Sequence, residues 1–163
     1  MNKPAIILVA EDEPTDAFFL ERAFKRAGVP VILHFVADGR ELIAYLKGEP
    51  PFADRAAHPF PQLLLLDLNL PRMSGFEVLS WIRKKSPFKD LQVVIFSASQ
   101  EPQDIHRAQD LGANSYLVKP HSIDELNELM ADPQAFRARV SEIVHNERQA
   151  LKLAPAMNLE LPR

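Results

Sequence analysis

The sequence predicts a doubly wound α/β domain, in which helices cover both faces of a parallel sheet. Short apolar runs rich in Ile, Val and Leu alternate with segments whose apolar residues recur every three or four positions. Five strands that are each followed by a helix imply a parallel sheet, because parallel neighbours need right-handed crossovers that carry the helices. At 163 residues and 47% hydrophobic content, the chain can bury one core with little left for a second domain. We therefore expect one domain with a C-terminal addition.

The first unit is a strand at residues 5–10 and a helix that begins at Pro14. The strand is an apolar run rich in Ile and Val, and the acidic triplet Glu11-Asp12-Glu13 follows it directly. Pro14 suits the first turn of a helix, and apolar residues then recur at helical spacing until Gly28 ends the pattern. The first strand therefore has an acidic carboxyl end.

The alternation continues through four more strands and their helices. Strands are expected at 31–36, 62–67, 91–97 and 115–118. Helices are expected at 39–47, 75–85, 102–111 and 123–130. The strand at 62–67 contains four consecutive leucines and ends at Asp67, which is typical of a strand buried on both faces. Ligands of open parallel sheets bind at the carboxyl ends of the strands, so the residues that follow the strands are the candidates for a site.

Two stretches depart from this regularity. Residues 48–61 carry four of the chain's 14 prolines and lack periodicity, which predicts a loop longer than usual. Phe52 and Phe60 could pin this loop to the surface, or the loop could contact a partner. Asp132-Pro133 predicts the start of a further helix, and the apolar tail after it needs a cover. We expect a domain at residues 5–130, and a helix and tail at residues 131–163 that form a homodimer arm or fold back on their own chain.

Composition excludes several classes of function. The net charge of −3 comes from mixed acidic and basic residues, so the chain lacks the basic stripe of a nucleic-acid-binding protein. The absence of cysteine excludes disulfides and thiolate metal sites, and the five histidines show no ligand spacing. No apolar run approaches the roughly 18 residues of a membrane span or forms a signal peptide. We expect a cytoplasmic protein that binds neither nucleic acid nor membrane.

Three acids gather at the predicted carboxyl edge of the sheet. Glu11 and Asp12 follow the first strand, and Asp67 ends the leucine strand. Clustered carboxylates repel one another and raise one another's pKa values unless a cation compensates them. Oxygen ligands without thiolate or imidazole favour a hard ion, so the sequence indicates a Mg²⁺ site.

Two further residues suit this edge to phosphoryl chemistry. Lys119 follows the last strand, where its ammonium could form a structural ion pair or hold a phosphoryl group. Ser97 ends the fourth strand and supplies a hydroxyl. A carboxylate can attack phosphorus without a general base, so the expected product is an acyl phosphate on Asp67.

These residues resemble the receiver domain of two-component response regulators. The similarity rests on Glu11-Asp12, the run from Leu66 to Gly75 around Asp67, Ser97-Ala98, and the run from Asn114 to Pro120. Together the four motifs, in this order at the ends of four strands, form a specific signal over about residues 5 to 130. Any one of them alone would be weak.

The resemblance implies a flavodoxin-like, CheY-like fold with strand order 2-1-3-4-5. It also implies that a phosphohistidine on a sensor kinase phosphorylates Asp67. Mg²⁺ would be held by Asp12, Asp67 and the backbone carbonyl of Asn69, with Glu11 acting through water. By the same analogy Ser97 and Tyr116 form the switch, and the Lys119-Pro120 peptide is cis.

Within this family the chain looks most like stand-alone regulators paired with phytochrome-type histidine kinases. The long insert, the phrase Leu-Asp-Leu-Asn-Leu-Pro-Arg-Met and the lack of an output domain suggest this pairing. Phe18 and Phe19 cannot both face the core of one amphipathic helix, so one of them could join Arg22 in a kinase-docking surface.

Two other functions stay open beside the phosphoacceptor, which is not an enzyme. An aspartate-nucleophile phosphohydrolase would usually carry a second carboxylate where this chain has Asn69. A receiver-like interaction module that is never phosphorylated is the other alternative. Each site residue also has a structural reading: Asp67 could cap a turn, Glu11 and Asp12 could favour the start of a helix, and Ser97 and Tyr116 could be ordinary strand residues.

Overall fold

The computed structural model describes residues 4–28 and 30–119. Within these residues the strands are β1 (Ala5–Ala10), β2 (Val31–Val36), β3 (Leu63–Leu66), β4 (Gln92–Ser97) and β5 (Ser115–Val118). The helices are α1 (Pro14–Ala27), α2 (Gly39–Lys47), α3 (Gly75–Lys84) and α4 (Pro102–Asp110). The expected helices after residue 120, the apolar tail and the predicted cis Lys119-Pro120 peptide lie outside the described residues.

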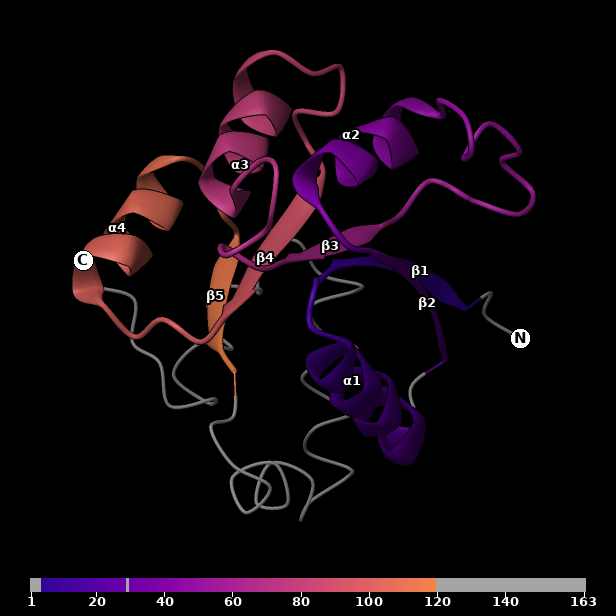
Figure 1. Ribbon diagram of the computed structural model, residues 1–163, viewed down its shortest axis with the longest axis horizontal. Helices are drawn as coiled ribbons and strands as arrows, with labels where there is room; N and C mark the ends of the chain where they lie inside the picture. The colour runs from indigo at the N-terminus through magenta and orange to yellow at the C-terminus, as the bar shows by residue number, and fades with distance from the viewer. Residues whose placement is uncertain (1–3, 29, 120–163) are drawn as a thin grey trace.

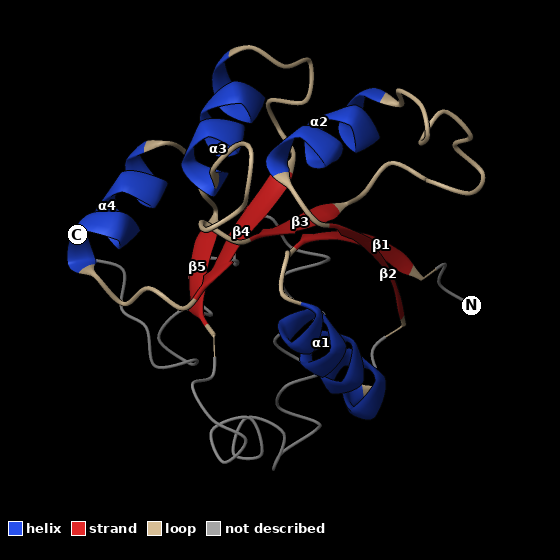
Figure 2. Ribbon diagram, in the orientation of Figure 1, coloured by secondary structure: helices blue, strands red, loops and turns tan. Residues whose placement is uncertain are grey.

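The five strands form one parallel sheet in the order β2-β1-β3-β4-β5. Helices α2, α3 and α4 lie on one face of this sheet, and α1 lies on the other (Figure 1, Figure 2). The doubly wound architecture and the strand order implied by the family resemblance are confirmed. The element ends agree with the sequence to within one residue; β3, for example, covers Leu63–Leu66.

The central strands bury both of their faces. All four leucines of β3 are at most 4% exposed. Alternate residues point to opposite sides, so Leu64 packs in the core under α2 and α3, whereas Leu65 packs toward Leu20 and Phe24 of α1. The core therefore holds β1 and β3 side by side, so that their carboxyl ends lie next to each other at one edge of the sheet.

The register between strands continues into the residues that follow them. Ala10 pairs with Leu66 across β1 and β3, and the next amide, that of Asp67, donates to the carbonyl of Ala10 at 3.1 Å. Between β4 and β5, Ser97 pairs with Val118, and the amide of Lys119 donates to the carbonyl of Ser97 at 2.8 Å. Backbone pairing thus delivers Asp67 and Lys119 to the same edge.

The insert at residues 48–61 packs against the carboxyl end of α2. Arg55 donates to the carbonyls of Tyr45 at 2.7 Å and Leu46 at 2.8 Å, in the last turn of this helix. Gly48 allows this approach, because its φ is +71° and a Cβ there would lie 2.9 Å from the Arg55 guanidinium. Phe52 is buried against the Tyr45 ring. The insert is therefore a pinned loop in which an arginine caps a helix.

Phe60 behaves differently from Phe52. Its side chain is 40% exposed and its ring lies 4.9 Å from the ring of Phe88, near the end of α3. Phe52 therefore pins the loop as expected, whereas Phe60 makes an exposed contact with Phe88.

Candidate functional site

Three side chains that each follow a different strand meet at the carboxyl edge of the sheet. Lys119 Nζ lies 2.8 Å from Asp67 Oδ2 and 2.5 Å from Glu11 Oε2. The contact with Asp67 is a hydrogen bond, and the contact with Glu11 is a buried ion pair. The lysine therefore sits between the first and third strands as the charge that compensates both acids.

The acidic cluster predicted from the sequence is formed. Glu11, Asp12 and Asp67 each offer one oxygen, and these oxygens lie within 4.8 Å of one another. Glu11 and Asp67 are buried and Asp12 is exposed, so the cluster opens to solvent on the side of Asp12. Three carboxylate oxygens gathered in this way are the ligands that a hard divalent cation prefers.

Charge and burial act in opposite directions on Lys119 and Glu11. Burial alone would lower the pKa of Lys119, but its contacts with Asp67 and Glu11 outweigh burial and raise that pKa. Burial raises the pKa of Glu11 to about 7; the contact with Lys119 offsets part of this effect, and the charge of Asp67 adds to it. The ammonium is therefore held charged, and the pKa of Glu11 is raised above its ordinary value.

The turn after β3 orients the Asp67 side chain. The amide of Asn69 donates to Asp67 Oδ1 at 3.1 Å, which leaves Oδ2 to face Lys119. Gly75 packs directly on this turn, where a Cβ would lie 2.3 Å from the Asp67 carbonyl oxygen. Ser74 then caps α3 through reciprocal hydrogen bonds with Glu77. The two Asp67 oxygens therefore have different partners.

Ser97 and Tyr116 lie beside this edge within the fold. Ser97 is fully buried, and its hydroxyl accepts from the amide of Ser99 at 3.3 Å. Tyr116 is 1% exposed, and its hydroxyl donates to the carbonyl of Ser99 at 2.8 Å. Burial raises the pKa of this phenol, so it remains a hydrogen-bond donor. The Tyr116 ring is thus held inward by the loop between β4 and α4.

Two residues that the sequence did not single out belong to this region. Asp16, in the first turn of α1, accepts a hydrogen bond from Lys119 Nζ at 3.0 Å. Ser99 connects Tyr116 to α4, because its hydroxyl donates to Asp104 Oδ2 at 2.6 Å. An acid in a first helical turn is usually explained by the helix dipole, so Asp16 carried no separate signal. The available clue was its position four residues after Asp12, at the start of the helix.

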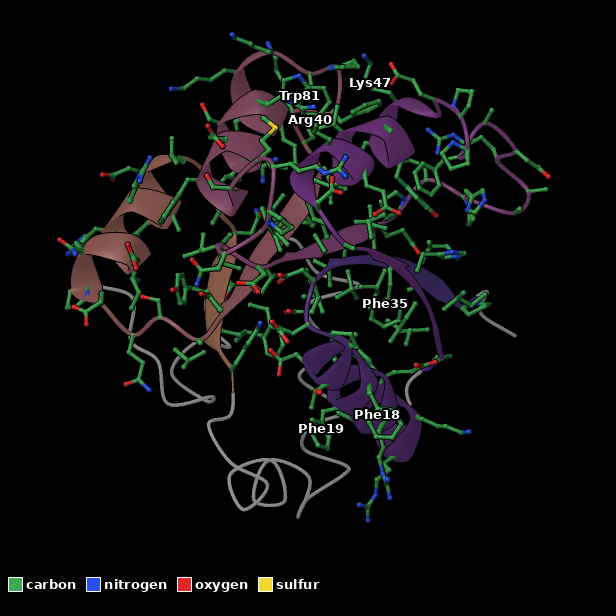
Figure 3. The ribbon with its side chains drawn as sticks, viewed as in Figure 1. Phe18, Phe19, Phe35, Arg40, Lys47 and Trp81 are labelled. Carbon is green, nitrogen blue, oxygen red and sulfur yellow. The ribbon has the colours of Figure 1, made fainter. Side chains whose placement is uncertain are left out.

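Helix α1 also presents an apolar and basic surface. Phe18 is 55% exposed, and the Phe19 ring lies 5.8 Å away in an edge-on arrangement (Figure 3). A shallow pocket beside Phe18 is lined by Glu21, Arg22, Lys25 and Arg26. The expectation that one of the two phenylalanines faces outward is met by Phe18.

In the part of the chain that the structure describes, no helix has the length and apolar character of a membrane span.

Comparison with known proteins identifies the family. The model of the response regulator receiver domain matches residues 7–131. Response regulator Rcp1 of Synechocystis is 30% identical over 135 residues, which cover 83% of this chain and 90% of Rcp1.

Solved structures show the same likeness. Response regulator RPA3017, from red light signaling of R. palustris, has a TM-score of 0.75 and 35% identity over 88% of this chain and 95% of that one. The phosphorylated cyanobacterial phytochrome response regulator RcpA has a TM-score of 0.72 and 32% identity over 88% and 95% of the two chains. Receiver domains bind Mg²⁺ or Mn²⁺ at an acidic pocket, and a solved form of Rcp1 is Mn²⁺-bound. The chain belongs to the family of response regulator receiver domains, whose mechanism is phosphorylation of an aspartate.

Proposed function

We propose that this chain is a response regulator that accepts a phosphoryl group on Asp67 from a sensor histidine kinase. The observation that carries the proposal is the position of the Asp67 carboxylate, which lies within 4.8 Å of the acidic pair that follows β1 and 2.8 Å from the ammonium of Lys119. The carboxylate needs no general base to attack phosphorus, and the Lys119 ammonium would pair with the negative charge of the phosphoryl oxygens. The product would be an aspartyl phosphate.

Mg²⁺ would be held by Asp12, Asp67 and the backbone carbonyl of Asn69, with Glu11 reaching it through water. The fit rests on the three clustered carboxylates, which offer oxygen ligands only. When bound, the ion would neutralise charge that develops on the transferring phosphoryl group. The protein side chains would supply position and the remaining charge.

The response would pass from Asp67 to the surface through Ser97 and Tyr116. Ser97 lies next to Lys119 in the backbone pairing of β4 and β5, and Tyr116 reaches the carbonyl of Ser99 in the following loop. Ser99 in turn contacts Asp104 in the first turn of α4. Phosphorylation would therefore change the surface that α4 presents to a partner.

The kinase partner that we propose is a phytochrome-type histidine kinase. RPA3017 is described as a response regulator in red light signaling, and RcpA as a phytochrome response regulator. In each comparison the match covers 95% of the relative's chain. The runner-up function, a phosphohydrolase, is disfavoured because Asn69 occupies the position where such enzymes usually carry their second carboxylate.

Phosphorylation of the full chain by acetyl phosphate and Mg²⁺ tests the proposed function. Intact mass should show one added phosphoryl group, and the addition should vanish in Asp67→Asn because the nucleophile is lost. Asp54→Asn, which changes an exposed aspartate of the insert, should leave the addition unchanged. Rapid turnover of phosphate esters would favour the phosphohydrolase. If no donor adds a phosphoryl group, the unphosphorylated interaction module is the function that remains.

Mg²⁺ affinity should depend on pH through Glu11. The pKa of about 7 means that a proton competes with the cation, so affinity should fall as the pH is lowered through neutrality. Titration calorimetry at about pH 6 and about pH 8 measures this effect. Glu11→Gln should flatten the dependence, whereas Glu13→Gln, at an exposed neighbour, should retain it. An affinity of the unsubstituted protein that is equal at both pH values would contradict the assignment.

Phe18 should contribute to kinase recognition, since it is the large apolar side chain that α1 exposes beside a basic pocket. Phe18→Ala should slow phosphotransfer from a phytochrome-type kinase by roughly fivefold or more. Phosphorylation by acetyl phosphate should be unaffected, because the small donor needs no docking surface. Phe60→Ala, at an exposed phenylalanine of the insert, serves as the matched control. Unchanged transfer rates in both Phe18→Ala and Phe19→Ala would rule out this surface.

We also propose a homodimer in which the apolar segment after residue 131 packs on the second subunit. The proposal rests on the sequence of that segment, which interleaves Leu153, Met157, Leu159 and Leu161 with prolines. In sedimentation, the full chain should be dimeric and a chain ending near Ala131 should be monomeric. A shortened chain that stays as dimeric as the full one would place the interface elsewhere.

A further inference from the structure

The partners of Lys119 include one acid that lies outside the carboxylate cluster. Its Nζ donates to Asp67 Oδ2 at 2.8 Å and to Asp16 Oδ2 at 3.0 Å. The Lys119 side chain is 9% exposed, whereas that of Asp16 is 40% exposed. A nearly buried ammonium thus has one hydrogen-bond partner at the end of β3 and another on α1.

A cation bound by the cluster would compete with Lys119 for some of these partners, but not for all. The cluster consists of Glu11, Asp12 and Asp67, and two of these acids are also partners of Lys119. Asp16 is not a member of the cluster. When a metal draws the charge of Glu11 and Asp67 to itself, Asp16 keeps its charge for the lysine, and a buried ammonium requires such a partner.

We propose that Asp16 is a positioning residue for Lys119 in phosphoryl transfer to Asp67, an inference that rests on the proposed function. Asp16 holds the ammonium from α1, so that Nζ passes from Asp67 Oδ2 to a phosphoryl oxygen without losing its other hydrogen-bonded carboxylate. In the reaction with acetyl phosphate, an Asp67 oxygen forms a bond to phosphorus. The bond from phosphorus to the acetate oxygen breaks, and acetate leaves with that electron pair. Asp16 makes no bond to phosphorus.

A purely structural role for Asp16 makes a different prediction. Asp16 is the third residue of α1, where a negative charge favours the helix dipole. If that were its whole role, its loss would lower the melting temperature by roughly 1 to 4 °C and leave the chemistry unchanged. The rate of phosphoryl transfer at saturating donor therefore separates the two roles.

The experiment compares full-length Asp16→Asn with the unsubstituted protein at saturating Mg²⁺ and increasing acetyl phosphate, followed by intact mass. The maximal rate should fall roughly three- to tenfold, because the lysine is less well placed in the transition state. The donor concentration at half-maximal rate should change by less than about twofold, since the uptake of the donor is unaltered. Asp16→Glu, which restores the carboxylate, should recover a substantial part of the rate.

Glu13→Gln is the matched control for charge. It removes one exposed carboxylate three residues before Asp16, and its side chain forms no ion pair among residues 4–28 and 30–119. Mg²⁺ affinity, measured by calorimetry, should change equally in Asp16→Asn and Glu13→Gln, while only the former loses rate. Equal maximal rates in the two variants, or no recovery in Asp16→Glu, would overturn the inference. If the unsubstituted protein takes up no phosphoryl group, the proposed function itself fails.

Discussion

The ion pairing of the Lys119 ammonium is the interaction on which the geometry of the site depends. Lys119 follows β5, yet it contacts carboxylates that follow β1 and β3 and a third carboxylate on α1. A charge with so little exposure is tolerated only while its partners are in place, and breaking such a pair typically costs about 3–5 kcal/mol. The lysine therefore ties four segments of the chain to one point at the carboxyl edge of the sheet.

The same point lies next to the elements that could read its charge. Lys119 donates its amide to the Ser97 carbonyl, and the loop after Ser97 holds Tyr116 inward and contacts the start of α4. Under the proposed function, a phosphoryl group on Asp67 would draw Lys119 and the Ser97 hydroxyl toward new partners. A shift of this loop would in turn change the surface at the start of α4.

The sequence predicted the fold and the site to the extent that backbone pattern decides them. Alternation of apolar runs located the strands, and parallel pairing then required Glu11, Asp67 and Lys119 to share one edge. Asp16 and Ser99 escaped prediction because their partners lie far along the chain or on the backbone, and neither stands directly at a strand end. The Arg55 contacts with α2 escaped it too, since they depend on how an irregular loop folds back.

The central claim is that Asp67, Lys119 and the acidic pair act as one phosphoryl site. A crystal structure of the full chain with Mg²⁺ and beryllofluoride, a mimic of the phosphoryl group, tests it most directly. The account predicts beryllofluoride on an Asp67 oxygen, Lys119 against a fluorine, and the ion on Asp12, Asp67 and the Asn69 carbonyl. Beryllofluoride bound elsewhere, or an ion held away from Asp12 and Asp67, would contradict it.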